Sequence, residues 1–456
     1  MRLADSVHIE ADMLTKLFAG VGIAFAFTGC VDEAAEPEVS TAEEMLRNNG
    51  FIPSGVAVPN STGISTTHST ASKGRIDLNN PFFQDLGTND RRCVSCHLPT
   101  AGWGITPGQM QAVFELTDGG AFDDGFGLGA VFRTNDGSNS PTADVSTLEA
   151  RRDAYSMLLT RGTIRVGIGI PDGAEFELIA VDDPYGHASA AELSLFRRPL
   201  PSTNLTLIPT VMWDGRVPNN PNVNGGLSDQ SNGATQGHAA APVAISQGVR
   251  NAIVSLETGL FTAQSVTYAA GNLADEGAKG GAKPLMTQAF VAGRFNLFDS
   301  WKTSKKAARK AVYRGQELFN TRQRDNTVPT PTGAGTCRGC HSAENSGTNK
   351  NGTFFNIGVS DGVHREADQP LYTLRRISDN TVITTTDPGR ALITGLWVDM
   401  NKFKVPSMRG LGARAPYFHG GSANTLKDVV DFYDESFNFT FTASERADLV
   451  AFLAAL

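Results

Sequence analysis

Two short motifs of cysteine and histidine constrain this chain more than any other feature of its sequence. They read Cys93-Val94-Ser95-Cys96-His97 and Cys337-Arg338-Gly339-Cys340-His341. In such a motif the two thiols can add to the vinyl groups of one porphyrin, and the adjacent histidine can ligate its iron. A zinc site would need further Cys or His residues at ligand spacing, and neither motif has them nearby. The motifs therefore predict two covalently bound c-type haems, with His97 and His341 as iron ligands.

The length and charge of the chain agree with two such sites. Its 456 residues are enough for two domains and a leader. The formal net charge is -8, and no sustained run of Lys or Arg interrupts the sequence. That balance gives no electrostatic footprint for nucleic acid, so we exclude nucleic-acid binding.

The first thirty residues are typical of a lipoprotein signal peptide. Lys16 precedes an apolar run over Leu17–Phe27, which ends in Thr28-Gly29-Cys30. This run is too short to span a bilayer, and small residues before a cysteine are typical of a lipidated export signal. We expect a protein of the periplasm or cell surface that contacts the membrane only through a lipid anchor on Cys30. Export agrees with the haem prediction, because c-type haems are attached outside the cytoplasm.

Composition divides the remaining chain into a spacer and two haem domains. Residues 31–77 are rich in Glu, Ser, Thr, Ala and Gly, which predicts a flexible spacer. We expect the N-terminal haem domain over 78–300 and the C-terminal one over 301–456. Residues from about 101 to 209 separate the first haem motif from the next recognisable block, so we interpret them as an insertion.

Apolar spacing predicts two helices and one hairpin in these domains. Helical periodicity extends over Val145–Leu159 and over Lys302–Phe319. The β-rich runs Thr163–Ile170 and Phe176–Val181 are joined by the turn sequence Pro171-Asp172-Gly173. We therefore expect a small β-hairpin inside the insertion.

Short polar signals complete the expected secondary structure. Thr425 with Asp428, and Thr442 with Glu445, have the capping-box spacing and predict the starts of two C-terminal helices. The polar, Gly- and Asn-rich stretch Asn219–Gly237 predicts a surface loop.

Three further blocks carry a resemblance to a known family. They are Trp213-Asp214-Gly215-Arg216, Lys404-Val405-Pro406-Ser407-Met408-Arg409, and Ala415-Pro416-Tyr417-Phe418-His419-Gly420-Gly421 followed by Thr425-Leu426. With the two haem motifs, they resemble the bacterial di-haem cytochrome c peroxidases and MauG-like enzymes. The resemblance implies a mainly α fold of two cytochrome c-like haem domains facing across an interface, with the hairpin-containing insertion in the N-terminal half.

The same resemblance implies a peroxidase. In the family, hydrogen peroxide reacts at the N-terminal haem, here that of His97, and the haem of His341 relays electrons to it. The electrons come from a small redox protein such as a cytochrome c, or from an oxidisable substrate. Trp213 matches a tryptophan that lies between the haems. The alternatives are a non-enzymatic di-haem electron carrier and a di-haem oxygenase acting on an organic substrate.

The second haem of the family takes a distal ligand eight residues after the Thr of the Thr-Leu pair. Counting from Thr425 gives Tyr433, as in the MauG-like members, whereas the peroxidases have Met there. A phenolate stabilises oxidised iron and a thioether favours reduced iron, so the two ligands have opposite effects. Met400 or Met408 is the alternative ligand.

Near the first haem, the family places a Gln and a proton-transferring Glu after the tryptophan block. Gln230 matches the Gln, but no Glu follows at the expected distance. His238 is the nearest residue able to transfer protons near neutral pH; it could instead ligate iron or lie in a surface loop. Arg216 could pair with a haem propionate. Family members often bind calcium, for which Asp118–Gly125 has only part of the ligand spacing.

Overall fold

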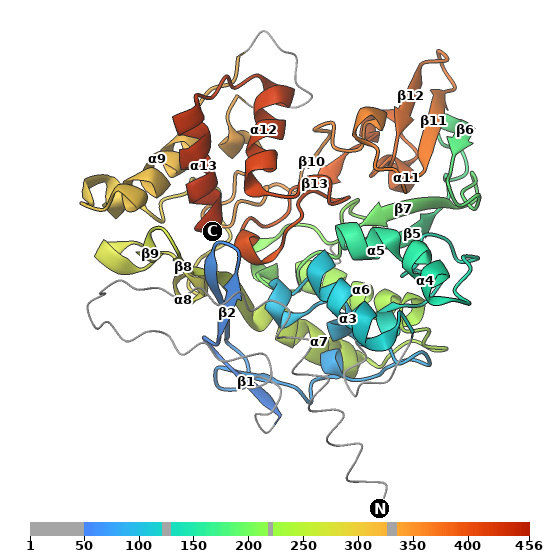
Figure 1. Cartoon of the computed structure of the whole chain (residues 1–456), viewed down its shortest axis with the longest axis horizontal. Coiled ribbons are helices and arrows are strands. Elements are labelled where there is room, and N and C mark those ends of the chain that lie inside the picture. Colours follow the sequence, from blue (N-terminus) through green and yellow to red (C-terminus); the bar gives the residue numbers. More distant parts are fainter. Residues whose placement is uncertain (1–49, 121–128, 218–221, 326–334) are drawn as a thin grey trace, which may run out of the picture.

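The computed structural model describes residues 50–120, 129–217, 222–325 and 335–456 (Figure 1). The predicted signal peptide, Cys30 and the spacer residues 31–49 lie outside those ranges. Within them, no helix combines the length and hydrophobicity needed to cross a membrane.

Helices and strands both build the fold, which is mixed rather than mainly α as expected. The helices are α3 (Pro107–Thr117), α4 (Leu148–Ala154), α5 (Ser156–Arg161), α6 (Val223–Gly237), α7 (Gln247–Gly259), α8 (Ala282–Leu285), α9 (Ala307–Thr321), α10 (Cys337–Cys340), α11 (Ala391–Thr394), α12 (Leu426–Phe437) and α13 (Ala443–Ala454). The strands are β1 (Phe51–Pro53), β2 (Ala57–Asn60), β3 (Gly63–Ser69), β4 (Arg75–Asp77), β5 (Ile164–Ile168), β6 (Phe176–Asp182), β7 (Leu193–Arg197), β8 (Leu260–Thr267), β9 (Gly271–Asn272), β10 (Phe354–Phe355), β11 (Leu371–Arg376), β12 (Val382–Thr385) and β13 (Phe403–Lys404).

The expectation of a flexible spacer is wrong from residue 50 onward, because residues 51–77 contain four strands. The strand β3 lies between β2 and β8 in a four-stranded antiparallel sheet, and β1 pairs with β4. The residues of β3 alternate between buried and half-buried positions. The small polar residues of this segment are therefore positions of a half-buried strand, which composition alone does not distinguish from a spacer.

The predicted hairpin in the insertion is also wrong. Both strands exist, but β5 pairs with β7, whereas β6 pairs with β11 of the C-terminal half. The resulting three-stranded sheet has the order β12-β11-β6. Long-range pairing outcompetes the local turn here because β6 buries Phe176 against the apolar face formed by Tyr372 and Leu374.

The helix predictions fared better at the C-terminal end. The capping boxes of Thr425 and Thr442 are present and start α12 and α13, as predicted. The periodic stretch Val145–Leu159 inside the insertion forms the two short helices α4 and α5. The predicted loop at 219–237 is wrong beyond residue 222: Asn222 caps α6, whose Leu227 is buried.

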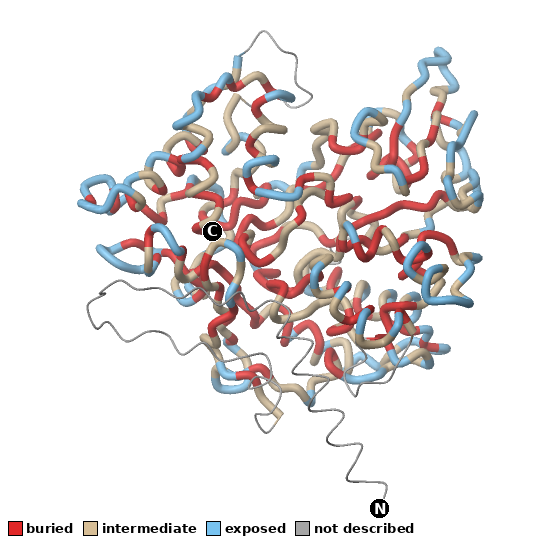
Figure 2. Tube along the Cα trace, in the orientation of Figure 1, coloured by how far each residue is buried: buried red, intermediate tan, exposed pale blue. Residues whose placement is uncertain are grey.

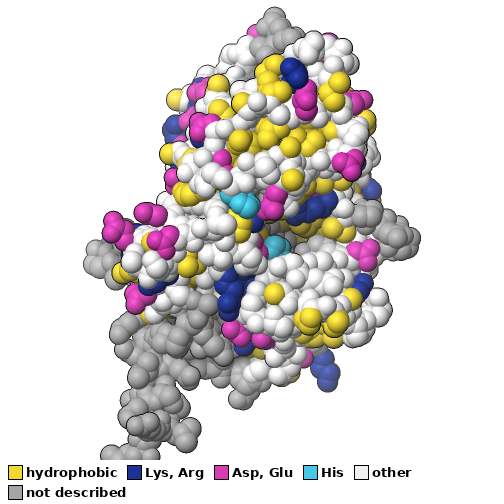
Figure 3. All heavy atoms as spheres, turned by 90° about the vertical axis from the view of Figure 1, so that its right-hand side faces the viewer, with side chains coloured by type: hydrophobic (Ala, Val, Ile, Leu, Met, Phe, Trp, Pro, Cys, Tyr) yellow, Lys and Arg dark blue, Asp and Glu magenta, His cyan; other side chains and the backbone are white. Residues whose placement is uncertain are grey.

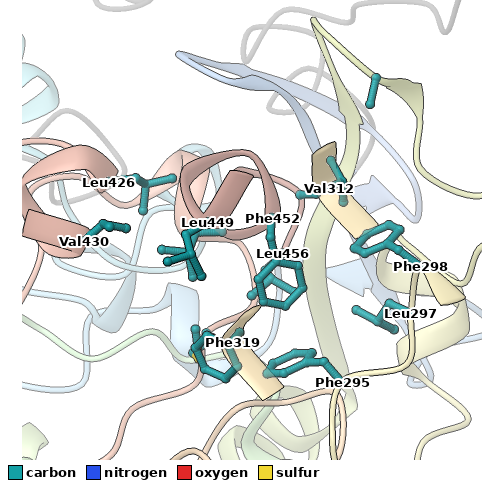
Figure 4. Close-up of a cluster of buried hydrophobic side chains, with 14 of the residues drawn as sticks. Phe295, Leu297, Phe298, Val312, Phe319, Leu426, Val430, Leu449, Phe452 and Leu456 are labelled. Carbon is teal, nitrogen blue, oxygen red and sulfur yellow. The ribbon is translucent and has the colours of Figure 1, made fainter. Parts of the chain in front are cut away.

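The largest core cluster lies in the C-terminal half and begins before the expected boundary at residue 300. Figure 4 shows the rings of Phe295, Phe298 and Phe319 gathered around Phe452. Phe295 and Phe452 meet edge to face, with ring centroids 5.2 Å apart. The cluster reaches back to Ala270, so residues 270–300 pack with the C-terminal haem motif.

Buried segments continue from one half of the molecule into the other (Figure 2). Exposed hydrophobic side chains gather on the upper part of the face in Figure 3, where the β12-β11-β6 sheet and its flanking loops lie. In β6, β12 and segments near them in the chain, the exposed large hydrophobic residues include Ile179, Val363, Ile377, Val382, Leu396 and Val398.

Candidate haem sites

The first cysteine motif forms a tight turn, and a backbone carbonyl fixes the orientation of its histidine. Cys93–Ser95 is a single 3-10 turn, and the His97 backbone nitrogen donates to the Cys93 carbonyl at 3.0 Å. His97 Nδ1 bonds the Trp103 carbonyl at 3.1 Å, which leaves Nε2 for a metal. Burial lowers the pKa of His97 to about 4, so its imidazole is neutral, as ligation requires.

A cavity opens beside this motif and collects most of the polar residues predicted from sequence. Cys93, Cys96 and His97 line it together with Gln230 and His238. Its other walls mix apolar and ionisable side chains: Val131, Leu200, Leu205, Leu227, Ala234, Ile253, Arg91, Arg92, Asp136, Arg197, Arg216 and Glu257.

The second motif repeats the same construction. Cys337–Cys340 forms the single turn α10, and His341 Nδ1 bonds the Gly347 carbonyl at 2.6 Å. Burial lowers the pKa of His341 as well. Both histidines therefore have Nδ1 held by a backbone carbonyl and Nε2 available to iron.

A second cavity lies beside this motif, and its walls are mostly aromatic and aliphatic. Cys337, Cys340 and His341 line it. Aromatic side chains from other segments also line it, and they include Phe319, Phe355, Phe403, Tyr417, Phe418, Tyr433 and Phe437. Burial raises the pKa of Tyr433 well above its ordinary range.

The two alternative methionines occupy different places. Met400 packs with Phe176 and Leu195 in the core of the β12-β11-β6 region, away from both cavities. Met408 does line the second cavity, and its sulfur packs against Gly347. The Gly347 carbonyl bonds His341 Nδ1, so Met408 packs against the residue that orients this histidine.

Trp213 lies in the wall that the two cavities share, and it lines both of them. Its Nε1 donates to the Arg198 carbonyl at 2.8 Å, and its own carbonyl accepts from the Lys404 nitrogen at 2.9 Å. The Trp213 ring meets the His419 ring edge on, with centroids 6.3 Å apart. Three segments distant in sequence therefore fix the indole between the motifs.

Buried cations in this region have no carboxylate partner among the described residues. Arg198, Lys404 and Arg414 donate only to backbone carbonyls, for example Lys404 Nζ to Thr210 at 2.8 Å. Burial lowers their pKa values, to about 7 for Lys404 and about 9 for Arg198. Uncompensated buried charge is costly, and the propionates of two haems would supply the missing anions. The residues present thus fit a haem in each cavity.

Arg216 and His419 line different cavities. Arg216 lines the first cavity, with Nη1 3.5 Å from an Asp214 carboxylate oxygen. His419 is buried, stacks on Phe403 with centroids 4.1 Å apart, and lines the second cavity. An ion-paired core of Arg197 with Asp214 and Asp387 lies beside them.

Sequence reasoning missed two acids in the first cavity. Asp136 pairs with His238 and Arg91, but it lies in an aperiodic loop that carries no sequence signal. Glu257 is buried on α7, and its Oε2 has no hydrogen-bond partner. Burial raises the pKa of Glu257 to about 8. Its signal was its helical spacing from the apolar Ile253 and Val254, which places an acid on the buried face of α7.

The predicted calcium stretch falls largely outside the described residues. Asp118 ends α3, whereas residues 121–128 are not described. Across the part of the chain with assigned positions, no group of three or more His, Cys, Asp or Glu side chains could hold a metal ion.

Sequence comparison finds similarity to proteins named cytochrome c peroxidases. Cytochrome-c peroxidase IdrP2 of Denitromonas iodatirespirans is 36% identical over 138 residues, covering 27% of this chain and 37% of the relative. Cytochrome-c peroxidase IdrP1 of the same species is 29% identical over 204 residues, covering 38% and 50%. The aligned regions thus span half or less of these relatives' lengths.

Comparison of folds gives a weaker likeness, and no protein-family model matches the chain. A solved MauG-like protein associated with microbial copper homeostasis aligns over 59% of this chain and 76% of its own. The sequence identity is 18% and the TM-score 0.33.

Proposed function

The chain is related to the bacterial di-haem cytochrome c peroxidase and MauG-like family, and from this premise we propose that it reduces hydrogen peroxide with two c-type haems. Cys93, Cys96 and His97 would hold one haem, and Cys337, Cys340 and His341 the other. When bound, the haems supply iron that exchanges electrons and, at an open position, meets peroxide. The donor is a small redox protein or an oxidisable substrate.

The position of Trp213 carries this proposal. Its indole lines the cavities of both motifs, so it is placed to shorten the path of an electron from the second site to the first. An indole that lines both cavities supports one reaction served by both motifs.

The protein residues around the first cavity support peroxide binding there. Gln230 presents a side-chain amide on α6 that can donate a hydrogen bond to peroxide. The apolar side chains Val131, Leu200 and Leu227 exclude bulk water from the same space, which strengthens such polar contacts.

We propose Tyr433 as the distal ligand of the second haem. It extends from α12 into the cavity of His341. Met408 also lines this cavity, but its sulfur packs against Gly347, whose carbonyl bonds His341, so we favour Tyr433 as the residue that would hold the iron. A phenolate ligand would stabilise the oxidised state of this haem.

Export and lipid attachment through Cys30 form a separate part of the proposal. They depend on the sequence of residues 1–30 alone. Metabolic labelling with a radioactive fatty acid tests them: the wild-type protein should incorporate label, and Cys30→Ala should not. Equal labelling of both would overturn the anchor.

A peroxide titration of the purified holoprotein tests the activity. Electron paramagnetic resonance should show a high-spin ferric haem that changes when peroxide is added, and reduced cytochrome c should then be oxidised. Two low-spin haems that do not respond to peroxide would overturn the proposal in favour of an electron carrier. A peroxide response without turnover of cytochrome c would instead indicate a different, MauG-like substrate.

A further inference from the structure

His238 is fixed in the first cavity by both its side chain and its backbone. It is the C-cap residue of α6, and its Nδ1 forms a short hydrogen bond with the Asp136 carboxylate. Its carbonyl accepts from Asn89 Nδ2 at 2.8 Å and from Arg91 Nη1 at 3.2 Å. Asn89 and Arg91 lie four and two residues before Cys93, so the segment that leads into the haem motif positions this histidine.

The carboxylate behind His238 is buried and held rigidly. Asp136 is 8% exposed and also binds the guanidinium of Arg91, which is 3% exposed. Arg91 in turn donates to the Ala130 and Val131 carbonyls at 2.8 and 2.9 Å. Burial alone would raise the pKa of Asp136, but the hydrogen bond from His238 and the charge of Arg91 outweigh it and lower the pKa. The carboxylate therefore stays ionised and orients the imidazole.

The second ring nitrogen of His238, Nε2, is available to a molecule in the cavity. With Nδ1 bound to Asp136, Nε2 is the nitrogen that His238 can present to a molecule in the space it lines. The side chain is 43% exposed, so protons can also reach it from solvent. The other ionisable side chains that line this cavity are His97, Arg92, Arg197, Arg198, Arg216, Glu257 and Lys404.

We propose that His238 is the proton carrier for peroxide cleavage and that Asp136, locked by Arg91, is its positioning residue. This inference rests on the peroxidase function proposed above. The family has a proton-transferring Glu that this sequence lacks at the expected place. Here His238 at the end of α6 and Asp136 of the insertion would take over its task.

The proton transfers balance the reaction. His238 Nε2 accepts a proton from one oxygen of hydrogen peroxide and returns it to the departing oxygen as the O–O bond breaks. Two electrons come from the reduced redox partner, and two further protons enter from solvent. The products are two water molecules, so the imidazole ends in its starting state.

Two substitutions in the holoprotein test the pair. His238→Gln should lower the second-order rate constant for peroxide by on the order of 100-fold, and Asp136→Asn by about tenfold. Asp136→Glu, which keeps a carboxylate able to orient the imidazole, should lose less of the rate than Asp136→Asn. His187→Gln is the matched control: His187 lies 3.4 Å from Glu192 in a similar pair, but lines neither cavity.

Resonance spectra separate this role from the alternatives. Both variants should retain two haems and the wild-type spin states. If His238→Gln converts a low-spin haem to a high-spin one, His238 is an iron ligand and the proposal is wrong. Wild-type rates in both variants would overturn the pair while leaving the peroxidase intact, whereas an unreactive wild-type protein would overturn both.

Discussion

The two cavities share a construction but differ in their walls. In each, a single turn carries two thiols and a histidine whose Nδ1 bonds a backbone carbonyl. The first is lined by the acids Asp136 and Glu257 and by His238, whereas the second is lined mostly by aromatic and aliphatic side chains. Polar walls serve chemistry that consumes protons, and apolar walls keep a redox centre dry. We therefore expect the two motifs to serve different tasks.

Removing one iron ligand at a time is the strongest test of this division. His97→Gly should abolish peroxide reduction, by at least about 1000-fold, while leaving the spectrum of the second haem. His341→Gly should retain the reaction with peroxide but block oxidation of the donor. Stopped-flow absorbance separates the two steps. If both variants lose the same step, the cavities do not have distinct roles.

Replacing the shared indole should have the next largest effect. Trp213→Phe keeps an aromatic ring but loses the hydrogen bond to the Arg198 carbonyl, so electron transfer between the haems should slow by on the order of tenfold. Both haem spectra should stay unchanged. Trp397→Phe is the control, since Trp397 lines neither cavity. An unchanged transfer rate in Trp213→Phe would mean that the electron takes another path.

The predicted phenolate ligand distinguishes the second cavity spectroscopically. Tyr433→Phe should alter the resonance spectrum of the second haem and raise its reduction potential, because an anionic ligand that favours ferric iron is lost. Potentiometry of each haem measures this. Tyr417→Phe is matched to it, as Tyr417 lines the same cavity with its hydroxyl 3.1 Å from the Leu411 carbonyl. Equal spectra for wild type and Tyr433→Phe would refute ligation.

Loosening the helix that carries Tyr433 should have the smallest effect. Thr425→Ala removes the capping box of α12 and should cost about 1 kcal/mol of unfolding free energy. Thr147→Ala removes the cap of α4 in the insertion at a similar cost. Only Thr425→Ala should broaden the absorbance signal of the haem held by His341. Denaturant unfolding with haem absorbance tests this, and identical spectra would show that α12 does not set the geometry of that haem.

Local chemistry explains which parts could be predicted from the sequence. The haem motifs and the two capping boxes each lie within a few residues, so their spacing contains the information that folding uses. The pairing of β6 with β11 joins residues about two hundred positions apart, and the adjacent turn sequence predicted the wrong partner.

In the candidate site, too, the sequence pointed to some residues and missed others. The family resemblance named Gln230, and the sequence left His238 open between proton transfer, iron ligation and a surface loop; both line the cavity beside the motif of His97. Asp136 reaches His238 from a loop 102 positions earlier, and no periodic pattern surrounds it. A long-range partner that works through one side-chain contact leaves no trace in local spacing.

The strand that leaves the N-terminal half to join β11 also has a mechanical consequence. Six residues of β11 pair with β6, and Arg161 with Glu366 and Arg365 with Asp182 add ion pairs across the same seam. Separating the halves would break this seam, so the distance between the two cavities is set when the chain folds. Turnover would then be timed by docking of the donor and supply of protons rather than by motion between the haems.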